Sequence, residues 1–511
     1  MGRDRILRTL LLLTMGAAAS APGGQAQKSA AAAEARLEGM ALLTAGLEAM
    51  GGRERLAALG SVRLEAEVTQ YQVGQTPRPD ELAVRLGTST YALTRNLRTR
   101  EWYLDASASR EAPEPRLRVV SARGDSFQHD LRNNTILEVP EGLGLEALAE
   151  RLPFAPAALL EAWSRSETVR ALPPGSSGAA ALTYADSAGR QIALTFDGRG
   201  LVRSIGIVER HGQLGDVVKR STFTDYRAVA DLLLPFTVVN TLDSLVTCES
   251  VLHDVTLDPP LEGALFSRPE GVPSSATQNR PTVADGAQKV EEIVPGVFQI
   301  LNVTPLYNVM LVQQDDDVYV IDAPGGETAY ELVRDSALRV LGGKEITGLV
   351  LTHHHFDHSS NLWRYLASGT KVFAPSSNEP FIRSVADAPR LGLREPQFPE
   401  PDIEAVDSRL TVGTGVNRFE LIDAGPNPHA DAILIVYFPE HKLFWVPDIY
   451  GYYPGFTPPP LLLSFAERFE ELDLDVEIIA TAHTELSSVT EFRDMVRRVR
   501  AGLAQPGGSD R

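Results

Sequence analysis

The first half of the chain changes its hydrophobic rhythm from helical to extended. Residues 34–59 place leucines and a methionine at three- and four-residue spacing, which predicts an amphipathic helix, and residues 144–163 predict a second one. Elsewhere apolar and polar residues alternate, as in half-buried strands, over residues 62–68, 82–93, 116–121, 192–196, 201–208, 217–226, 233–242 and 246–257. We therefore predict an α+β domain over residues 34–267, with an antiparallel sheet and helices on one of its faces.

The second half alternates strands with helices. Residues 268–288 are rich in proline, serine, glycine and threonine, and we predict that they form a linker. After it, strands are predicted at residues 309–312, 318–321, 346–352, 371–373, 418–422, 432–437, 443–446 and 476–480. Helices are predicted at residues 327–341, 360–367, 464–472 and 488–503. This alternation predicts a layered α/β domain over residues 289–505.

The composition narrows the classes of function. The 511 residues are 43% hydrophobic and 23% charged, which is the balance of a soluble globular protein. The formal net charge of −19 repels phosphate backbones, so we expect no nucleic-acid partner. Cys248 is the single cysteine of the sequence, so the chain forms no internal disulfide. Any metal site must be built from His, Asp and Glu.

The first residues have the order of a targeting segment. Arg3, Arg5 and Arg8 give a basic start, residues 9–19 are apolar and small, and further small residues follow. This order is typical of a secretory signal peptide, here residues 1–26, and an N-terminal helix is the alternative. We expect a periplasmic or secreted protein. No later apolar run reaches the roughly 18 residues of a membrane span, so we expect no integral membrane segment after cleavage.

One cluster of metal-capable residues stands at the end of a predicted strand. The apolar run 346–352 ends in His353-His354-His355-Phe356-Asp357-His358. Sites in α/β folds are built at strand ends, and His353 and His355 project to the same side because side chains alternate. Neutral imidazoles and a carboxylate suit a zinc-like cation, and such groups crowded together without a cation are costly to desolvate. His354 points the other way and is expected to pack or to form a hydrogen bond.

The pattern His353-x-His355-x-Asp357-His358 resembles the signature of the metallo-β-lactamase superfamily, whose fold is an αββα sandwich. The resemblance implies three further ligands at the ends of later strands, and His429, Asp448 and His483 stand in the right order. It implies two divalent metal ions, the first held by His353, His355 and His429, the second by Asp357, His358 and His483, with Asp448 bridging them. Zinc is the default for such a nitrogen-rich set, although iron or manganese fit the same ligands. Asp322, at the end of another strand, matches the structural aspartate of the family.

The same resemblance implies a hydrolase. A hydroxide that bridges the two metals would attack an ester, lactone or related electrophilic bond, and Asp357 would accept a proton from the attacking water. A true β-lactamase is disfavoured, because those enzymes typically lack the bridging aspartate and the commonest kind uses a cysteine. Tyr450 and Tyr452, in the loop after Asp448, are candidate proton or hydrogen-bond donors to the substrate, and an aromatic packing loop is the alternative.

The first half resembles the periplasmic lipoprotein-carrier family, an open half-barrel closed by helices. The resemblance rests on residues 51–59, on Leu234-Pro235-Phe236 and on Phe266-Ser267-Arg268-Pro269. It implies an apolar concave face for acyl chains, and so a small-molecule or acyl and lipidic substrate. The alternatives are a β-domain without a ligand, or a non-enzymatic periplasmic protein that binds lipid or lipoprotein and carries a structural metal site. The sequence leaves the oligomeric state open.

Overall fold

The structure is a computed structural model, in which the chain divides into two compact units. It describes residues 25–81, 83–109, 114–122, 125–138, 149, 151–173, 178–275, 289–304, 307–390, 399–451 and 457–502. The first unit comprises Met1–Gln72, Arg85–Arg210 and Val217–Gln278. The second comprises Val73–Val84, His211–Asp216 and Asn279–Arg511. Two short segments from the first half of the sequence therefore belong to the second unit.

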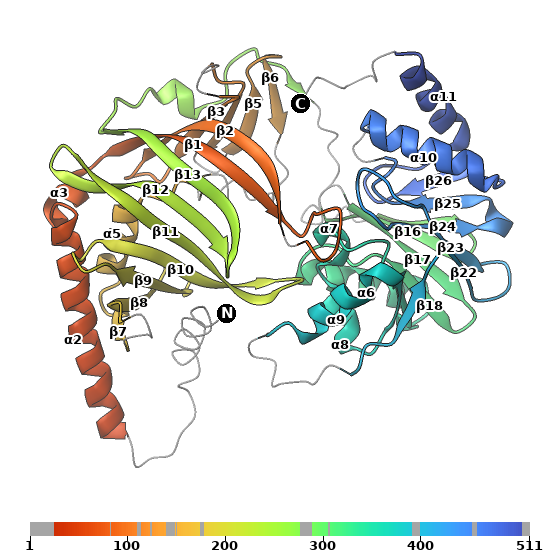
Figure 1. Ribbon diagram of the computed structural model, residues 1–511, viewed down its shortest axis with the longest axis horizontal. Helices are drawn as coiled ribbons and strands as arrows, with labels where there is room; N and C mark the ends of the chain where they lie inside the picture. Colours follow the sequence, from red (N-terminus) through yellow and green to blue (C-terminus); the bar gives the residue numbers. More distant parts are fainter. Residues whose placement is uncertain are drawn as a thin grey trace. The chain divides into compact units, whose positions relative to one another are not determined.

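A large sheet dominates the first unit (Figure 1). Its described strands lie in the order β14-β6-β5-β4-β3-β2-β1-β13-β12-β11-β10-β9-β8-β7. Pairs such as β1 with β13 and β11 with β12 run antiparallel, as predicted, whereas the short β14 runs parallel to β6. The strands are β1 (Ser61–Val73), β2 (Ala83–Asn96), β3 (Trp102–Ser107), β4 (Leu117–Ala122), β5 (Asp125–Asp130), β6 (Thr135–Glu138), β7 (Arg170–Leu172), β8 (Ala181–Ala185), β9 (Gln191–Phe196), β10 (Val202–His211), β11 (Gly215–Val229), β12 (Leu232–Leu242), β13 (Leu245–Leu257) and β14 (Ser274–Ser275).

Helices pack against this sheet through a shared apolar cluster. They are α2 (Gln25–Ala49), α3 (Arg53–Ala58) and α5 (Ala155–Ser164), and a 3-10 turn, η2 (Gly263–Phe266), follows β13. Leu43 and Leu47 of α2 and Leu159 of α5 are buried among side chains of the strands. The prediction of one helix over residues 34–59 is wrong, because the helix breaks at Gly51. Gly51 has a φ of 121°, and a Cβ atom there would lie 2.4 Å from Leu232 Cδ2.

Two sheets build the second unit. The first has the order β15-β16-β17-β18-β19-β20-β21 and the second the order β22-β23-β24-β25-β26-β27. The neighbours from β18 to β21 run parallel, as do β25 and β26. The strands are β15 (Lys289–Val294), β16 (Val297–Thr304), β17 (Tyr307–Gln314), β18 (Asp317–Ile321), β19 (Gly348–Val350), β20 (Lys371–Pro375), β21 (Ile403–Val406), β22 (Arg409–Val412), β23 (Phe419–Asp423), β24 (Leu434–Phe438), β25 (Leu443–Val446), β26 (Ile478–Thr481) and β27 (Ser487–Ser488).

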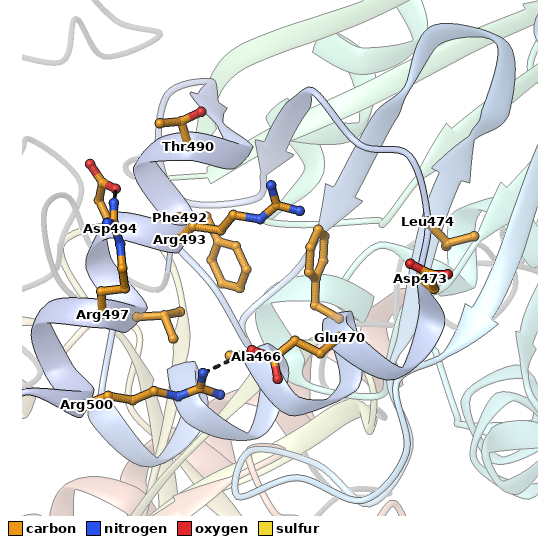
Figure 2. Close-up of a pocket in the computed structure, with 12 residues that line it drawn as sticks. Ala466, Glu470, Asp473, Leu474, Thr490, Phe492, Arg493, Asp494, Arg497 and Arg500 are labelled. Atoms are coloured by element: carbon orange, nitrogen blue, oxygen red, sulfur yellow. Dashed lines mark hydrogen bonds and ion pairs between the residues drawn. The ribbon is translucent and has the colours of Figure 1, made fainter.

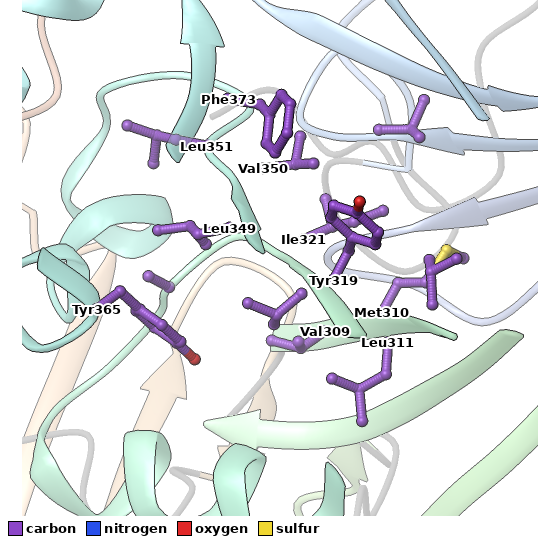
Figure 3. Close-up of a cluster of buried hydrophobic side chains, with 14 of the residues drawn as sticks. Val309, Met310, Leu311, Tyr319, Ile321, Leu349, Val350, Leu351, Tyr365 and Phe373 are labelled. Atoms are coloured by element: carbon purple, nitrogen blue, oxygen red, sulfur yellow. The ribbon is translucent and has the colours of Figure 1, made fainter. Parts of the chain in front are cut away.

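Apolar clusters join these sheets to each other and to helices. The helices are α6 (Glu327–Val340), α7 (Phe356–Ser359), α8 (Leu362–Ala367), α9 (Glu379–Asp387), α10 (Pro459–Leu472) and α11 (Val489–Arg500), with 3-10 turns η4 (Ser376–Asn378) and η5 (Pro439–His441). Figure 3 shows side chains of this buried cluster, among them Val309 of β17, Ile321 of β18 and Tyr365 of α8. On β24, Leu434 and Val436 belong to this cluster, whereas Ile435 belongs to one with α10 and α11. The strand is buried on both faces, which explains its continuous apolar sequence.

Most predicted elements of the second half are present with shifted bounds. The predicted strand 346–352 is shorter, because β19 ends at Val350 and the Thr352 N–H is bonded to the Asp322 carboxylate at 2.8 Å. The structure adds α9 and the strands β15, β16, β21, β22 and β27, none of which was predicted. The short or irregular apolar patterns of these strands carry little periodic signal.

Some predictions fall on residues that the structure does not describe. They are most of the predicted signal peptide, the start of the helix predicted at 144–163 and most of the predicted linker, that is residues 1–24, 144–148 and 276–288. Residues 151–154 interrupt that predicted helix, and α5 begins after them at Ala155. Among the described helices, none combines the length and the apolar character needed to cross a membrane.

Candidate metal centre

The histidine-rich motif lies directly after β19. His353 and His355 stand in the loop that follows this strand, and Asp357 and His358 stand in the four-residue helix α7. The backbone N–H of His358 bonds to the His355 carbonyl at 3.0 Å, so the chain turns tightly here. This turn brings side chains from both parts of the motif to the carboxyl end of the parallel strands, where α/β folds place their sites.

The three later predicted ligands also follow or precede strands. His429 lies in the loop between β23 and β24, where the Asn427 side chain accepts the His429 N–H at 2.9 Å and the Ala430 N–H at 3.0 Å. This local turn holds the imidazole in place. Asp448 follows β25 and His483 follows β26, so two adjacent parallel strands deliver them to one edge.

A first compact group contains His353, His355, His429 and Asp448. One potential ligand atom of each lies within 4.8 Å of the others. His353 Nε2 and His429 Nε2 are 3.1 Å apart, and Asp448 Oδ2 is 3.0 Å from His429 Nε2. Nitrogen lone pairs that converge at this distance repel each other unless a proton or a cation lies between them.

A second compact group contains Asp357, His358, Asp448 and His483, again within 4.8 Å. Asp448 Oδ1 lies 2.9 Å from His358 Nε2 and 3.0 Å from His483 Nε2. Asp357 Oδ2 lies 3.8 Å from His358 Nε2 and 3.6 Å from His483 Nε2. Asp448 therefore offers one oxygen to each group and stands between them. The structure brings all seven predicted ligand residues together.

A buried carboxylate orients His358, one member of the second group. Asp322 is fully buried and lies 2.8 Å from His358 Nδ1. It also accepts the Thr352 N–H at 2.8 Å, the Thr352 hydroxyl at 2.9 Å and the Tyr307 hydroxyl at 3.2 Å. An acceptor on Nδ1 leaves the lone pair of His358 on Nε2, which faces Asp448.

Burial keeps two imidazoles of the first group, those of His353 and His355, neutral. It lowers the pKa of His353 well below its ordinary value, and the neighbouring imidazoles add to the effect. Burial also lowers the pKa of His355 to about 2, again helped by adjacent imidazoles. Neutral imidazoles are the form that binds metal ions.

In the second group, nearby opposite charges outweigh burial in setting the pKa values. Burial alone would lower the pKa of His358, but the carboxylates of Asp448, Asp322 and Asp357 outweigh it and raise that pKa well above the ordinary value. Burial alone would raise the pKa of Asp448, but the surrounding histidines lower it well below the ordinary value. The buried carboxylates thus favour a positive charge at this position, whether a proton or a metal ion supplies it.

The donor set fits divalent cations. His355 Nδ1 is buried and has no hydrogen-bond partner among the described residues. A buried polar atom without a partner lowers stability by about 1–3 kcal/mol. A cation bound at this nitrogen would remove that cost. The first group offers three imidazoles and a carboxylate, and the second offers two of each, which are donors that zinc accepts.

Three residues near the motif were not anticipated. Gln75 Nε2 donates to Asp357 Oδ1 at 2.6 Å, and the Thr76 carbonyl oxygen lies 2.9 Å from His355 Nε2. Gln213 Nε2 donates to the His354 carbonyl at 2.8 Å. All three belong to the second unit but precede the motif by well over a hundred positions. Nothing in their local sequence signals such a contact.

Of the two tyrosines predicted as donors to a substrate, the structure describes Tyr450 but not Tyr452. Tyr450 is buried, its hydroxyl lies 3.2 Å from Ser487 Oγ, and its ring is 5.1 Å from that of Phe492. These contacts favour the interpretation that Tyr450 packs in the cluster under α10 and α11. Tyr452 lies outside the described residues. A catalytic role of either side chain stays a prediction. His354 belongs to neither group and, as expected, forms a hydrogen bond, from Nε2 to the Thr76 carbonyl at 2.8 Å.

A cavity of about 590 Å³ lies elsewhere in the second unit (Figure 2). Residues of α10 and α11 line much of it, among them Phe469 and Phe492, and Arg500 forms an ion pair with Glu470 at 3.0 Å. None of the seven clustered residues lines this cavity. This cavity is therefore separate from the candidate metal centre.

A buried histidine beside α7 predicts acid-sensitive stability. The ring of His211 lies 4.8 Å from that of Phe356, and His211 Nδ1 accepts the Leu214 N–H at 3.2 Å. Burial, helped by Arg390, lowers the pKa of His211 to about 4. Because the folded pKa lies below the unfolded one, its contribution is complete above pH about 6.5 and is lost as the pH falls toward 4, by up to about 3 kcal/mol.

The His211→Asn variant tests this expectation, because asparagine keeps an acceptor and does not titrate. Urea unfolding of both proteins at pH 7 and pH 4.5 measures the change in the free energy of unfolding. We expect a smaller loss in the variant than in the wild type. An equal loss in both proteins would show that His211 does not contribute.

Comparisons with known proteins place a family resemblance in the same region. Residues 305–444 match the family model of the metallo-beta-lactamase superfamily. No curated protein sequence matches the chain. Among solved structures, the metallo-beta-lactamase FIM-1 from Pseudomonas aeruginosa in its mono-zinc form is 14% identical, with a TM-score of 0.33, over 42% of this chain and 96% of that one. A metallo-beta-lactamase from Pontibacter korlensis is 16% identical, with a TM-score of 0.32, over 42% and 99%.

Proposed function

From a metallo-beta-lactamase superfamily domain at residues 305–444, we propose that the protein is an exported hydrolase with two metal ions. The observation that carries the proposal is the position of Asp448, which is a member of both ligand groups. We assign His353, His355 and His429 to one ion, and Asp357, His358 and His483 to the other. Zinc is the proposed metal, because imidazole and carboxylate are its usual ligands outside cysteine sites.

The arrangement supports hydrolysis of an electrophilic bond. Two bound cations would lower the pKa of a water molecule toward neutrality and would polarise the group under attack. Asp357 is the least buried of the four residues in its group, with 37% of its side chain exposed. Its Oδ2 faces His358 and His483, so it can both bind an ion and accept a proton from water that enters from solvent.

We propose an ester, a lactone or a related acyl compound as the substrate. The presence of Asp448 between the two groups, and the position of the single cysteine, Cys248, outside the superfamily domain, argue against a β-lactamase with a cysteine ligand. Export, predicted from residues 1–26, would bring the enzyme into contact with acyl compounds of the cell envelope. The layered clusters around β24 support the αββα sandwich that we propose for the domain.

Metal analysis combined with hydrolysis assays tests the proposed function. We expect the purified full chain to hold about two zinc ions and to hydrolyse members of an ester and lactone panel. The Asp357→Ala variant is expected to lose at least about 100-fold in kcat/KM, because even partners that only orient a metal ligand contribute about 10- to 100-fold. Asp335→Ala, on the exposed surface of α6, is the matched control and should keep full activity.

A specific cavity favours a second candidate function, a non-enzymatic lipid-binding protein with a structural metal site. A pocket of about 530 Å³ in the first unit is lined by apolar residues, three arginines and Glu161, and the excess of arginines suits a ligand with an acyl chain and an anionic head group. Its lining includes Leu56, Trp102, Phe154, Arg95 and Arg98. Stoichiometric zinc without turnover on any substrate, together with a fatty acid bound to the purified protein, would favour this second function over the first.

A further inference from the structure

The connection between β1 and β2 is a loop whose shape is set by its own hydrogen bonds. Thr76 is fully buried, and its hydroxyl lies 2.9 Å from the Arg78 carbonyl oxygen and 2.7 Å from that of Glu81. Arg78 and Glu81 also form an ion pair at 2.7 Å. These contacts within the loop help to define its conformation.

Backbone hydrogen bonds hold this loop against two segments that carry ligands. The Phe356 N–H donates to the Gly74 carbonyl at 2.8 Å, and the Asp431 N–H donates to the Pro77 carbonyl at 2.9 Å. Gly74 has a φ of 73°, and a Cβ atom there would lie 2.3 Å from Gln213 Oε1. The close approach therefore requires glycine at this position.

The Thr76 carbonyl oxygen sets the tautomer of His355. It lies 2.9 Å from His355 Nε2 and 2.8 Å from His354 Nε2. A carbonyl oxygen only accepts hydrogen bonds and has two lone pairs, so both rings must carry their proton on Nε2. For His355 this leaves the lone pair on Nδ1, which is the nitrogen that is buried without a partner.

The Gln75 side chain forms a hydrogen bond with only one of the two carboxylate oxygens of Asp357. Its Nε2 donates to Oδ1 at 2.6 Å, whereas Oδ2 faces the imidazoles of His358 and His483. A carboxylate held at one oxygen by a donor presents the other oxygen in a fixed direction. Asp357 is the most exposed of these ligand residues, so it has the most rotational freedom to lose without this bond.

We propose that Gln75 and Thr76 are positioning residues of the metal centre. Thr76 fixes the nitrogen through which His355 binds one ion, and Gln75 fixes the oxygen through which Asp357 binds the other. The inference rests on the proposed function in one respect, that the two groups bind metal ions. Ligand geometry at this centre is then completed by a loop that lies outside the superfamily match at residues 305–444.

Zinc competition with a chromophoric chelator tests the inference on the full chain without any substrate. Gln75→Met keeps the length of the side chain and removes the donor, and Gln75→Ala removes both. We expect each variant to release one of its two zinc ions at about 10- to 100-fold lower chelator concentration than the wild type. Gln72→Ala, at an exposed position of the same strand end, should behave as the wild type.

Two further measurements separate positioning from folding. We expect the melting temperature of the metal-free Gln75→Met variant to equal that of the metal-free wild type, with a smaller increase on adding zinc. In ¹⁵N-edited spectra of the zinc-loaded wild type, His355 should carry its proton on Nε2. Zinc retention by Gln75→Met equal to the wild type, or a proton on His355 Nδ1, would overturn the inference.

The outcomes also separate this inference from the proposed function. A wild type that binds two zinc ions but hydrolyses no ester or lactone contradicts the hydrolase and leaves the positioning role supported, provided that the Gln75 variants lose zinc. A wild type that binds no zinc contradicts both.

Discussion

Replacement of Asp448 by alanine is expected to remove one metal ion and to lower kcat/KM by at least about 100-fold, more than the loss of a partner that only orients a ligand. Asp448 is buried to 2% exposure and supplies one oxygen to each ligand group. Without its negative charge, two cations at neighbouring positions would repel each other in a medium of low dielectric constant. Zinc stoichiometry and steady-state kinetics on the same preparation measure both effects.

Two comparisons make the Asp448 result specific. Asp448→Asn keeps the shape of the side chain and removes its charge, so we expect a loss of the same order as for alanine. Asp494→Ala, on the surface of α11, removes an exposed carboxylate that only pairs with Arg497, and it should have no effect on zinc content. Full zinc content and activity within a few-fold of the wild type in Asp448→Ala would contradict a centre shared by two ions.

Replacement of Asp322 by alanine is expected to destabilise the metal-free protein by about 3–5 kcal/mol, the usual loss when one partner of a buried charged pair is removed. Asp322 is fully buried and accepts hydrogen bonds from Thr352 and Tyr307 besides its contact with His358. The change leaves those buried donors without an acceptor. The residue also has a φ of 68°, which alanine tolerates poorly.

Asp322→Asn separates the two roles of this residue. Asparagine adopts positive φ values more readily, and its carbonyl oxygen can still accept the Thr352 N–H. Its amide nitrogen, however, can only donate to His358, which would disturb the tautomer that directs Nε2 toward Asp448. We therefore expect less than half of the alanine destabilisation in urea unfolding, but about 10- to 100-fold weaker zinc binding. Wild-type stability of Asp322→Ala would refute the structural role of the carboxylate.

Through Gln75 and Thr76, the first half of the sequence contributes contacts to the candidate metal centre. The loop after β1 and the segment 211–216 are the parts of that half assigned to the second unit. Gln213 of that segment donates to the His354 carbonyl and to Ser359 Oγ, both at 2.8 Å. The motif is therefore supported from two loops that lie in different parts of the sequence.

The candidate site was largely predictable because its chemistry is concentrated in a short segment. Four of the seven ligand residues fall between His353 and His358, and a strand followed by such a motif is recognisable without any tertiary information. The remaining candidate ligands followed from the resemblance to the metallo-β-lactamase superfamily, which implies ligands at the ends of later strands. Many strands of both halves were also predictable, since alternation and continuous apolar runs depend only on neighbours in sequence. Strands such as β3, β6 and β21 were not predicted.

Other features depended on contacts between distant residues, which periodicity does not encode. Gly51, which interrupts the helix predicted over residues 34–59, lies against Leu232, and Tyr450 packs against Phe492. Asp448 shares its two oxygens between two groups of histidines, and the Thr76 carbonyl meets His355 across 279 positions. Local sequence therefore decided which residues can bind metal and which segments form helices or strands. Only the packed chain decided which atom of each residue faces the site, because that orientation is imposed by neighbours that folding brings together.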